Sequence, residues 1–83
     1  MRRTLIAGNW KMNGLRQTGT QLAADLAKRA RITDRLGCDI LVCPPATLLL
    51  PVAAALAGCT IAVGGQDCHP ARAGAHTGDI SAE

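Results

Sequence analysis

Gly-Asn-Trp-Lys-Met-Asn-Gly, residues 8–14, directly follows the short apolar run Thr-Leu-Ile-Ala of residues 4–7. The apolar run predicts a strand over Thr4–Trp10, so that Asn9 and Lys11 stand where the chain leaves the sheet. In α/β folds, ligands bind at the carboxyl edge of the strands. An ammonium group at that edge indicates an anionic ligand.

Strand-like and helix-like segments alternate along the rest of the chain. They are expected at Thr4–Trp10 (strand), within Leu15–Gly37 (helix), and at Asp39–Cys43 (strand), Thr47–Ala57 (helix) and Thr60–Gly64 (strand). Thr18 followed by Gln21 fits a capping box at the start of the first helix. Leu22, Leu26 and Ala30 mark its expected buried face, which Ala23 and Ala27 widen. The alternation predicts an α/β chain whose parallel strands are joined by right-handed crossovers.

The last third of the chain contains a long loop, residues 65–79, which is polar and contains glycine. Irregular connections of this length usually have a function or are disordered. Ser81 is typical of a helix N-cap, so a further helix is expected to begin there, which indicates a chain that continues past Glu83. Ordering costs about 1.5 kcal/mol per residue, and three strands leave two open edges, so we expect the segment alone to be marginally stable or prone to aggregation.

Composition excludes several classes of partner. Hydrophobic residues make up 48% of the chain, and Trp10 is the only aromatic residue, so a stacking platform for single-stranded nucleic acid is not expected. The net charge is +3. A basic cluster near the end of the first expected helix consists of Lys28, Arg29, Arg31 and Arg35. We interpret it as a solvated helix end, where the dipole favours cations, and we expect no nucleic-acid partner.

The apolar runs are too short for export or membrane insertion. The run after residue 3 is interrupted by Asn9 and Lys11, short of the roughly 7–15 residues of a signal peptide. Leu48–Ala57 is too short to span a bilayer. We therefore expect no membrane partner and a cytoplasmic location. The four cysteines show no C-x-x-C spacing, so a disulfide framework is not expected.

Four motifs in a fixed order resemble one family. They are Gly-Asn-Trp-Lys-Met-Asn-Gly at 8–14, Cys-Pro-Pro at 43–45, Gly-Gln-Asp at 65–67 and Gly-Ala-His-Thr-Gly-Asp-Ile-Ser at 74–81. Together they cover essentially the whole chain, which resembles the N-terminal third of the triose-phosphate isomerase family. The resemblance implies a partial (β/α)8 barrel, and interconversion of dihydroxyacetone phosphate and glyceraldehyde 3-phosphate through an enediolate, with no cofactor and no metal.

The resemblance also implies roles for individual residues. Asn9 and Lys11 match substrate-binding residues, and Lys11 would stabilise negative charge during catalysis. The substrate would be a small phosphorylated three-carbon sugar. In this family a glutamate acts as the general base and a neutral histidine polarises the carbonyl group. The resemblance implies that both residues lie beyond residue 83.

A homodimer formed through loop 65–79 is a further implication of the resemblance. The residues expected at its interface are Asn13, Gln66, His76, Thr77 and Gly78. Thr77 matches a threonine that reaches the partner's active-site rim. The chain departs from the family at His76, where many members have an aromatic residue, and at Asp67, where many have asparagine.

Three other interpretations remain open at this stage. The chain could have an assembly role only, packing onto missing barrel units or onto another copy. It could belong to another phosphate-binding barrel that shares the lysine after the first strand. A zinc module that uses Cys68 and His69 is the weakest alternative, because no second ligand pair has a usual spacing. The absence of G-x-G-x-x-G after the first strand argues against a dinucleotide site.

Overall fold

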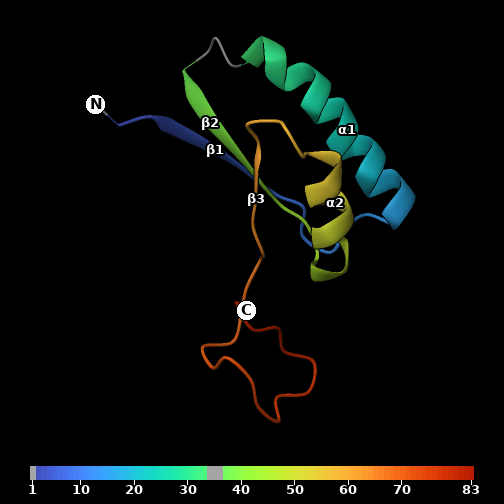
Figure 1. Ribbon diagram of the computed structural model, residues 1–83, viewed down its shortest axis with the longest axis vertical. Helices are drawn as coiled ribbons and strands as arrows, with labels where there is room; N and C mark the ends of the chain where they lie inside the picture. The colour runs from blue at the N-terminus through green and yellow to red at the C-terminus, as the bar shows by residue number, and fades with distance from the viewer. Residues whose placement is uncertain (1, 34–36) are drawn as a thin grey trace.

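The structure, a computed structural model, describes residues 2–33 and 37–83, with the backbone alone for residues 31–33. Its elements are β1 (Thr4–Asn9), α1 (Arg16–Thr33), β2 (Cys38–Cys43), the 3-10 helix η2 (Ala46–Leu48), α2 (Leu49–Ala55) and β3 (Ala62–Val63). Figure 1 shows α1 and α2 together on one side of the three strands. The alternation predicted from the sequence is confirmed.

The three strands form a parallel sheet in the order β1-β2-β3. β1 and β2 pair along their full length, from Thr4 opposite Cys38 to Asn9 opposite Cys43. β3 is shorter than the predicted Thr60–Gly64, because only Ala62 and Val63 pair with β2, opposite Leu41 and Val42. All carboxyl ends therefore lie at one edge of the sheet.

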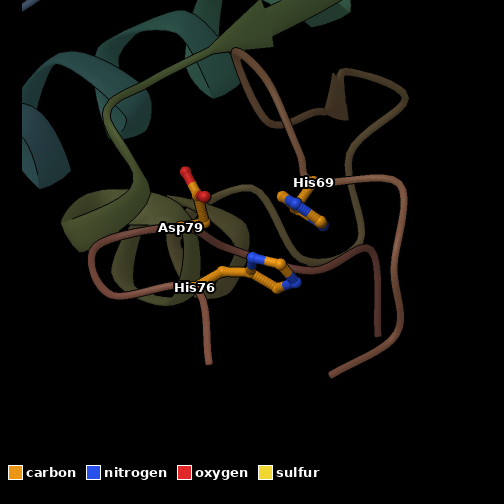
Figure 2. A group of neighbouring side chains, drawn as sticks. All are labelled: His69, His76 and Asp79. Carbon is orange, nitrogen blue, oxygen red and sulfur yellow. The ribbon is translucent and has the colours of Figure 1, made fainter. Parts of the chain in front are cut away.

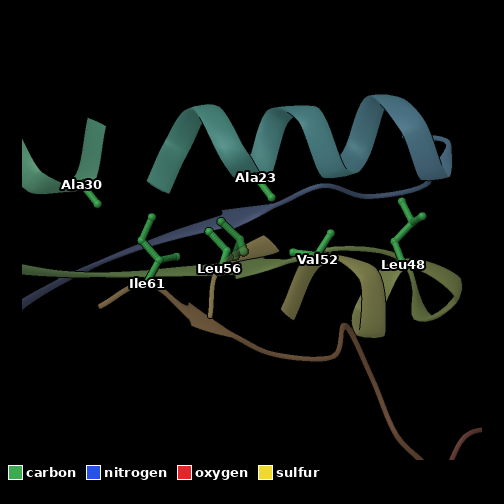
Figure 3. Packing of buried hydrophobic residues seen from close by; sticks show 7 residues of the cluster. Ala23, Ala30, Leu48, Val52, Leu56 and Ile61 are labelled. Atoms are coloured by element: carbon green, nitrogen blue, oxygen red, sulfur yellow. The ribbon is translucent and has the colours of Figure 1, made fainter. Parts of the chain in front are cut away.

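A single apolar cluster holds the helices on the sheet (Figure 3). Its buried members are Ala23, Ala30, Val42, Leu48, Val52, Leu56 and Ile61. Leu22, predicted to be buried, is 48% exposed, whereas Ala23 is fully buried. Ala30 is buried too, and Leu26 and Ala27 pack against the cluster, so the predicted face is confirmed except at Leu22.

The start of α1 differs from the predicted capping box. The helix begins at Arg16, so Thr18 lies inside its first turn. The Thr18 hydroxyl accepts a hydrogen bond from the Leu15 backbone N–H at 3.0 Å. Thr18 therefore occupies the third helical position of a capping box, whose side chain bonds to the backbone of the cap residue. It is not the cap itself. Pro51 lies in the first turn of α2, where its missing N–H costs least.

The structure also tests the helix expected to begin at Ser81 and the basic cluster expected at the end of the first helix. Residues 79–83 form no helix, because Ser81 instead makes an isolated parallel bridge with His69. Lys28 and Arg29 are exposed, as expected of a solvated helix end, whereas Arg35 lies outside the described residues. None of the helices in the described parts of the chain is long and apolar enough to cross a membrane.

β1 is the least covered element of the fold. Every one of its residues is exposed, including Leu5 at 56% and Ile6 at 55%. β1 is an edge strand, with β2 on one side only. An apolar edge strand of this kind is a surface onto which further structure can pair.

Candidate functional site

The polar residues predicted to bind a ligand lie at the carboxyl edge of the sheet. Asn9 is the last residue of β1 and stands opposite Cys43, the last residue of β2. Lys11 follows two residues after Asn9, and Gln66 follows three residues after the end of β3. Parallel pairing brings these three segments to one place, although they are far apart in the sequence.

Lys11 has an unusual backbone conformation. Its φ is 57°, and it is the only described non-glycine residue with a positive φ. The side-chain oxygen of Asn9 accepts a hydrogen bond from the Lys11 N–H at 2.9 Å. Asparagine commonly stabilises turns by bonding to the backbone two residues on. A left-handed lysine costs roughly 1–2 kcal/mol, so the surrounding contacts must hold it there.

Gln66 supplies two of those contacts. Its side-chain nitrogen donates to the carbonyl oxygen of Lys11 at 2.8 Å and to that of Cys43 at 3.0 Å. The Trp10 N–H donates to the same Cys43 carbonyl at 3.0 Å. Gln66 thus ties the loops after β1, β2 and β3 together. The sequence placed Gln66 only at the expected interface rim; its hydrogen bonds to these carbonyls depend on distant backbone positions and leave no local signal.

The remaining residues of the loop after β1 fix its shape. The Asn13 side-chain nitrogen donates to the Trp10 carbonyl oxygen at 2.9 Å. Trp10 packs against the apolar cluster. A methyl group added at Gly14, which has a φ of 106°, would come within 3.1 Å of Leu48. The turn between β1 and α1 is therefore shaped by hydrogen bonds on one side and by close packing on the other.

The Lys11 side chain is exposed and has no ion-pair partner among residues 2–33 and 37–83. Its backbone is restrained while its ammonium group stays free of carboxylates. A lysine of this kind can meet an anionic ligand without first breaking a salt bridge. The geometry fits the predicted role in binding a phosphorylated compound.

Residues 69–81 form a closed loop that projects beyond the carboxyl edge of the sheet (Figure 1). The His69 N–H donates to the Ile80 carbonyl oxygen at 2.7 Å, which brings the two ends of the loop together. His76, Thr77 and Gly78 lie in the projecting part and are exposed. The segment predicted to contact a second copy is therefore exposed to solvent, and the hydrogen bond between His69 and Ile80 closes the loop at its base.

The weakest sequence interpretation, a zinc site of Cys68 with His69, does not match the side-chain geometry. The described groups close enough to share a metal ion are His69, His76 and Asp79, and Cys68 is not among them. This group, drawn in Figure 2, was not predicted from the sequence, because its members are seven and three residues apart and no common motif has that spacing.

The sequence left open two kinds of barrel with such a lysine, the triose-phosphate isomerase family and another phosphate-binding barrel. Comparison with known proteins distinguishes them. The family model for triosephosphate isomerase matches residues 4–83. The chain belongs to the triosephosphate isomerase family. The triosephosphate isomerase of Granulibacter bethesdensis is 60% identical over 81 residues, which are 98% of this chain and 32% of that protein. The protein of the same name from Xanthobacter autotrophicus is 57% identical over 82 residues, or 99% of this chain and 32% of that protein.

A solved structure supports the family assignment at the level of the fold. The crystal structure of triosephosphate isomerase from Bartonella henselae superposes with a TM-score of 0.79 at 43% identity, over 95% of this chain and 31% of that one. The α/β fold and its partial-barrel character are thereby confirmed. The chain spans about a third of the length of the curated relatives that it matches.

Proposed function

We propose that this chain supplies the substrate-binding lysine and asparagine of a triosephosphate isomerase, within a protein that contains the complete barrel. The observation that carries the proposal is the position of Lys11. Its restrained backbone lies at the carboxyl edge of the sheet beside Asn9, and its ammonium group has no competing carboxylate among the described residues.

The chemistry of the proposed reaction explains why a cation belongs there. Removing a proton from the carbon beside a carbonyl group creates an enediolate, and negative charge grows on oxygen in the transition state. A fixed ammonium group stabilises that charge without reorganising during the reaction. An ammonium and an anion about 4 Å apart attract each other by roughly 4 kcal/mol at an effective dielectric constant of 20. Lys11 would act on both the phosphate and the developing oxyanion.

The chain cannot complete this reaction by itself, in our proposal. The general base and the neutral hydrogen-bond donor are expected from the glutamate and histidine that the family carries beyond the matched third. His69 and His76 lie in the projecting loop and do not replace them. The substrate that we propose is a phosphorylated three-carbon sugar, and the location that we propose is cytoplasmic.

We also propose that the protein is a homodimer and that loop 65–79 forms part of its interface. Thr77 would reach the active-site rim of the partner, with Asn13, Gln66, His76 and Gly78 nearby. The support is the closed, projecting form of the loop and the exposure of Thr77. A closed base lets the loop present side chains to a partner at little further cost in chain entropy.

A purely assembling role is the second candidate, and the exposed apolar residues Leu5 and Ile6 of β1 favour it. One experiment separates the two. We define the barrel chimera as a protein in which this chain replaces the matching 81 residues of the Granulibacter bethesdensis relative. If the chain has an assembly role only, Lys11→Ala leaves the isomerase activity of the chimera unchanged.

If the proposal is correct, the chimera is active and Lys11→Ala lowers its kcat/KM by about a thousandfold, the equivalent of the roughly 4 kcal/mol attraction. Lys28→Ala is the matched control, since Lys28 is an exposed lysine on α1, and it should leave kcat/KM unchanged. Circular dichroism of all three proteins checks that the fold is retained. Full activity of the Lys11→Ala chimera would refute the proposal.

A further inference from the structure

Side-chain amides on both sides of Lys11 hold its backbone in the left-handed conformation. The Asn9 side-chain oxygen accepts a hydrogen bond from the Lys11 N–H at 2.9 Å, and the Gln66 side-chain nitrogen donates to the Lys11 carbonyl oxygen at 2.8 Å. A further amide belongs to Asn13, whose side-chain nitrogen donates to the Trp10 carbonyl oxygen at 2.9 Å. Because Lys11 lies between these two residues, the side chain of Asn13 reaches back across it.

The Trp10 carbonyl oxygen belongs to the same peptide group as the Lys11 N–H. A peptide group is planar, so its oxygen and its N–H turn together about the backbone. Asn9 holds the N–H end of this plane, and Asn13 holds the oxygen end. The φ of Lys11, 57°, measures rotation about the bond that leads from this plane to the Cα atom. Amides at opposite ends of the plane therefore fix a conformation that most residues adopt only at a cost in energy.

We propose that Asn13 is a positioning residue for Lys11. Its amide holds the peptide group before the lysine and so fixes the direction in which the lysine side chain leaves the backbone. This role rests on the proposed function, in which Lys11 binds the phosphorylated substrate. It is additional to the interface role expected of Asn13 from the family resemblance. The hydrogen bond lies within one chain, so it does not require Asn13 to be free of a partner.

The start of α1 is closed by contacts that do not involve the Asn13 side chain. The Gly19 N–H donates to the Leu15 carbonyl oxygen at 2.7 Å, and the Leu15 N–H donates to the Thr18 hydroxyl at 3.0 Å. These contacts all lie after Asn13, whereas the Asn13 amide bonds backward, to the residue before Lys11. The amide therefore acts on the peptide group of the lysine and not on the helix.

Trp10 gives the hydrogen bond from Asn13 a fixed end. The Trp10 N–H donates to the Cys43 carbonyl oxygen at 3.0 Å, and Trp10 packs against the apolar cluster. The Gln66 amide donates to the same carbonyl at 3.0 Å, and Asn9 stands opposite Cys43 in the sheet. The amides around the lysine are thus tied to the end of β2. A functional group held in this way depends on its supporting contacts for its position.

The test compares Asn13→Ala and Asn13→Leu with the unchanged barrel chimera. Both substitutions remove the amide, and leucine keeps nearly the size of asparagine, so a loss common to both is due to the hydrogen bond. We expect each to lower kcat/KM by about tenfold, the effect of losing one hydrogen bond, and to weaken competitive inhibition by inorganic phosphate by a similar factor. Gln17→Ala is the matched control, because it removes an exposed amide from the first turn of α1, and it should change neither value.

Further measurements separate positioning from loss of the fold or of the dimer. Circular dichroism checks the fold, and kinetics are measured at a protein concentration at which sedimentation velocity shows variant and unchanged chimera in the same oligomeric state. In a Lys11→Ala chimera, Asn13→Ala should have no further effect on kcat/KM or on phosphate inhibition. An additive loss in that background would overturn the proposal, as would unchanged phosphate inhibition in Asn13→Ala or full activity of Asn13→Leu.

The Lys11→Ala chimera distinguishes an error about Asn13 from an error about the proposed function. If Lys11→Ala leaves the chimera fully active, both the proposed function and the role of Asn13 are wrong. If Lys11→Ala lowers kcat/KM but Asn13→Ala does not, Lys11 binds the substrate without help from Asn13, and only the positioning role is overturned.

Discussion

The side-chain amide of Gln66 donates a hydrogen bond of 2.8 Å to the backbone carbonyl of Lys11, a residue 55 positions earlier in the chain. The two residues come from loops after different strands. The contact links the loop that leads toward the proposed dimer interface with the residue proposed to bind substrate. A substitution of Gln66 should therefore alter the backbone position of Lys11.

We predict that Gln66→Ala lowers the kcat/KM of the barrel chimera by about tenfold. The substitution removes two hydrogen bonds to backbone carbonyls, each worth about 0.5–1.5 kcal/mol, and with them the restraint on the Lys11 backbone. Steady-state kinetics measures the effect. Gln21→Ala is the control, because it removes a glutamine that donates to the Asp25 side chain on the surface of α1.

A double-mutant cycle distinguishes a role of Gln66 in positioning Lys11 from a general loss of protein stability. If Gln66 acts through Lys11, adding Gln66→Ala to a Lys11→Ala chimera should have no further effect on kcat/KM. Independent, additive losses would show that Gln66 acts elsewhere.

The positive φ of Lys11 gives a prediction about stability. Glycine adopts φ 57° without the steric cost that a Cβ atom imposes, so Lys11→Gly should be more stable than Lys11→Ala by about 1 kcal/mol. Urea denaturation of the two chimera variants measures this difference. Equal stability of the pair would mean that Lys11 relaxes to a negative φ in solution.

The projecting loop gives a prediction about assembly. Thr77 is exposed at the part of the loop that we propose to contact a second copy, so Thr77→Arg should convert a dimeric chimera into monomers. Sedimentation velocity distinguishes the two species. Thr47→Arg, which changes an exposed threonine in η2, should leave the dimer intact. An unchanged sedimentation profile for Thr77→Arg would refute the interface assignment.

The 83-residue chain alone should be only marginally stable. β1 exposes Leu5 and Ile6, and the sheet has two open edges, so little apolar surface is buried for the chain entropy that folding removes. We expect a broad thermal transition or aggregation, observed by circular dichroism and light scattering. A sharp, cooperative transition of the monomer would contradict this.

The sequence was sufficient to predict the order of the elements, because each strand contains a short apolar run, and Pro44 and Gly64 directly follow β2 and β3. It was also sufficient to place Asn9 and Lys11 at the carboxyl edge, since strand polarity fixes which residues leave the sheet there. It could not reveal the left-handed backbone of Lys11, because lysine has no preference for that conformation and distant contacts impose it. Leu22 is the one misplaced residue of the predicted face of α1, because an apolar side chain in such a stripe is not covered unless another element packs over it. Ala23, Leu26, Ala27 and Ala30 of the same face do pack against the cluster.

The contact between the ends of loop 69–81 has a consequence for engineering. A segment whose entry and exit are joined to each other can be exchanged for another sequence without altering the strands that carry it. Residues 72–75 are therefore a suitable place to graft a foreign peptide, which the protein would display on a base fixed by its own backbone.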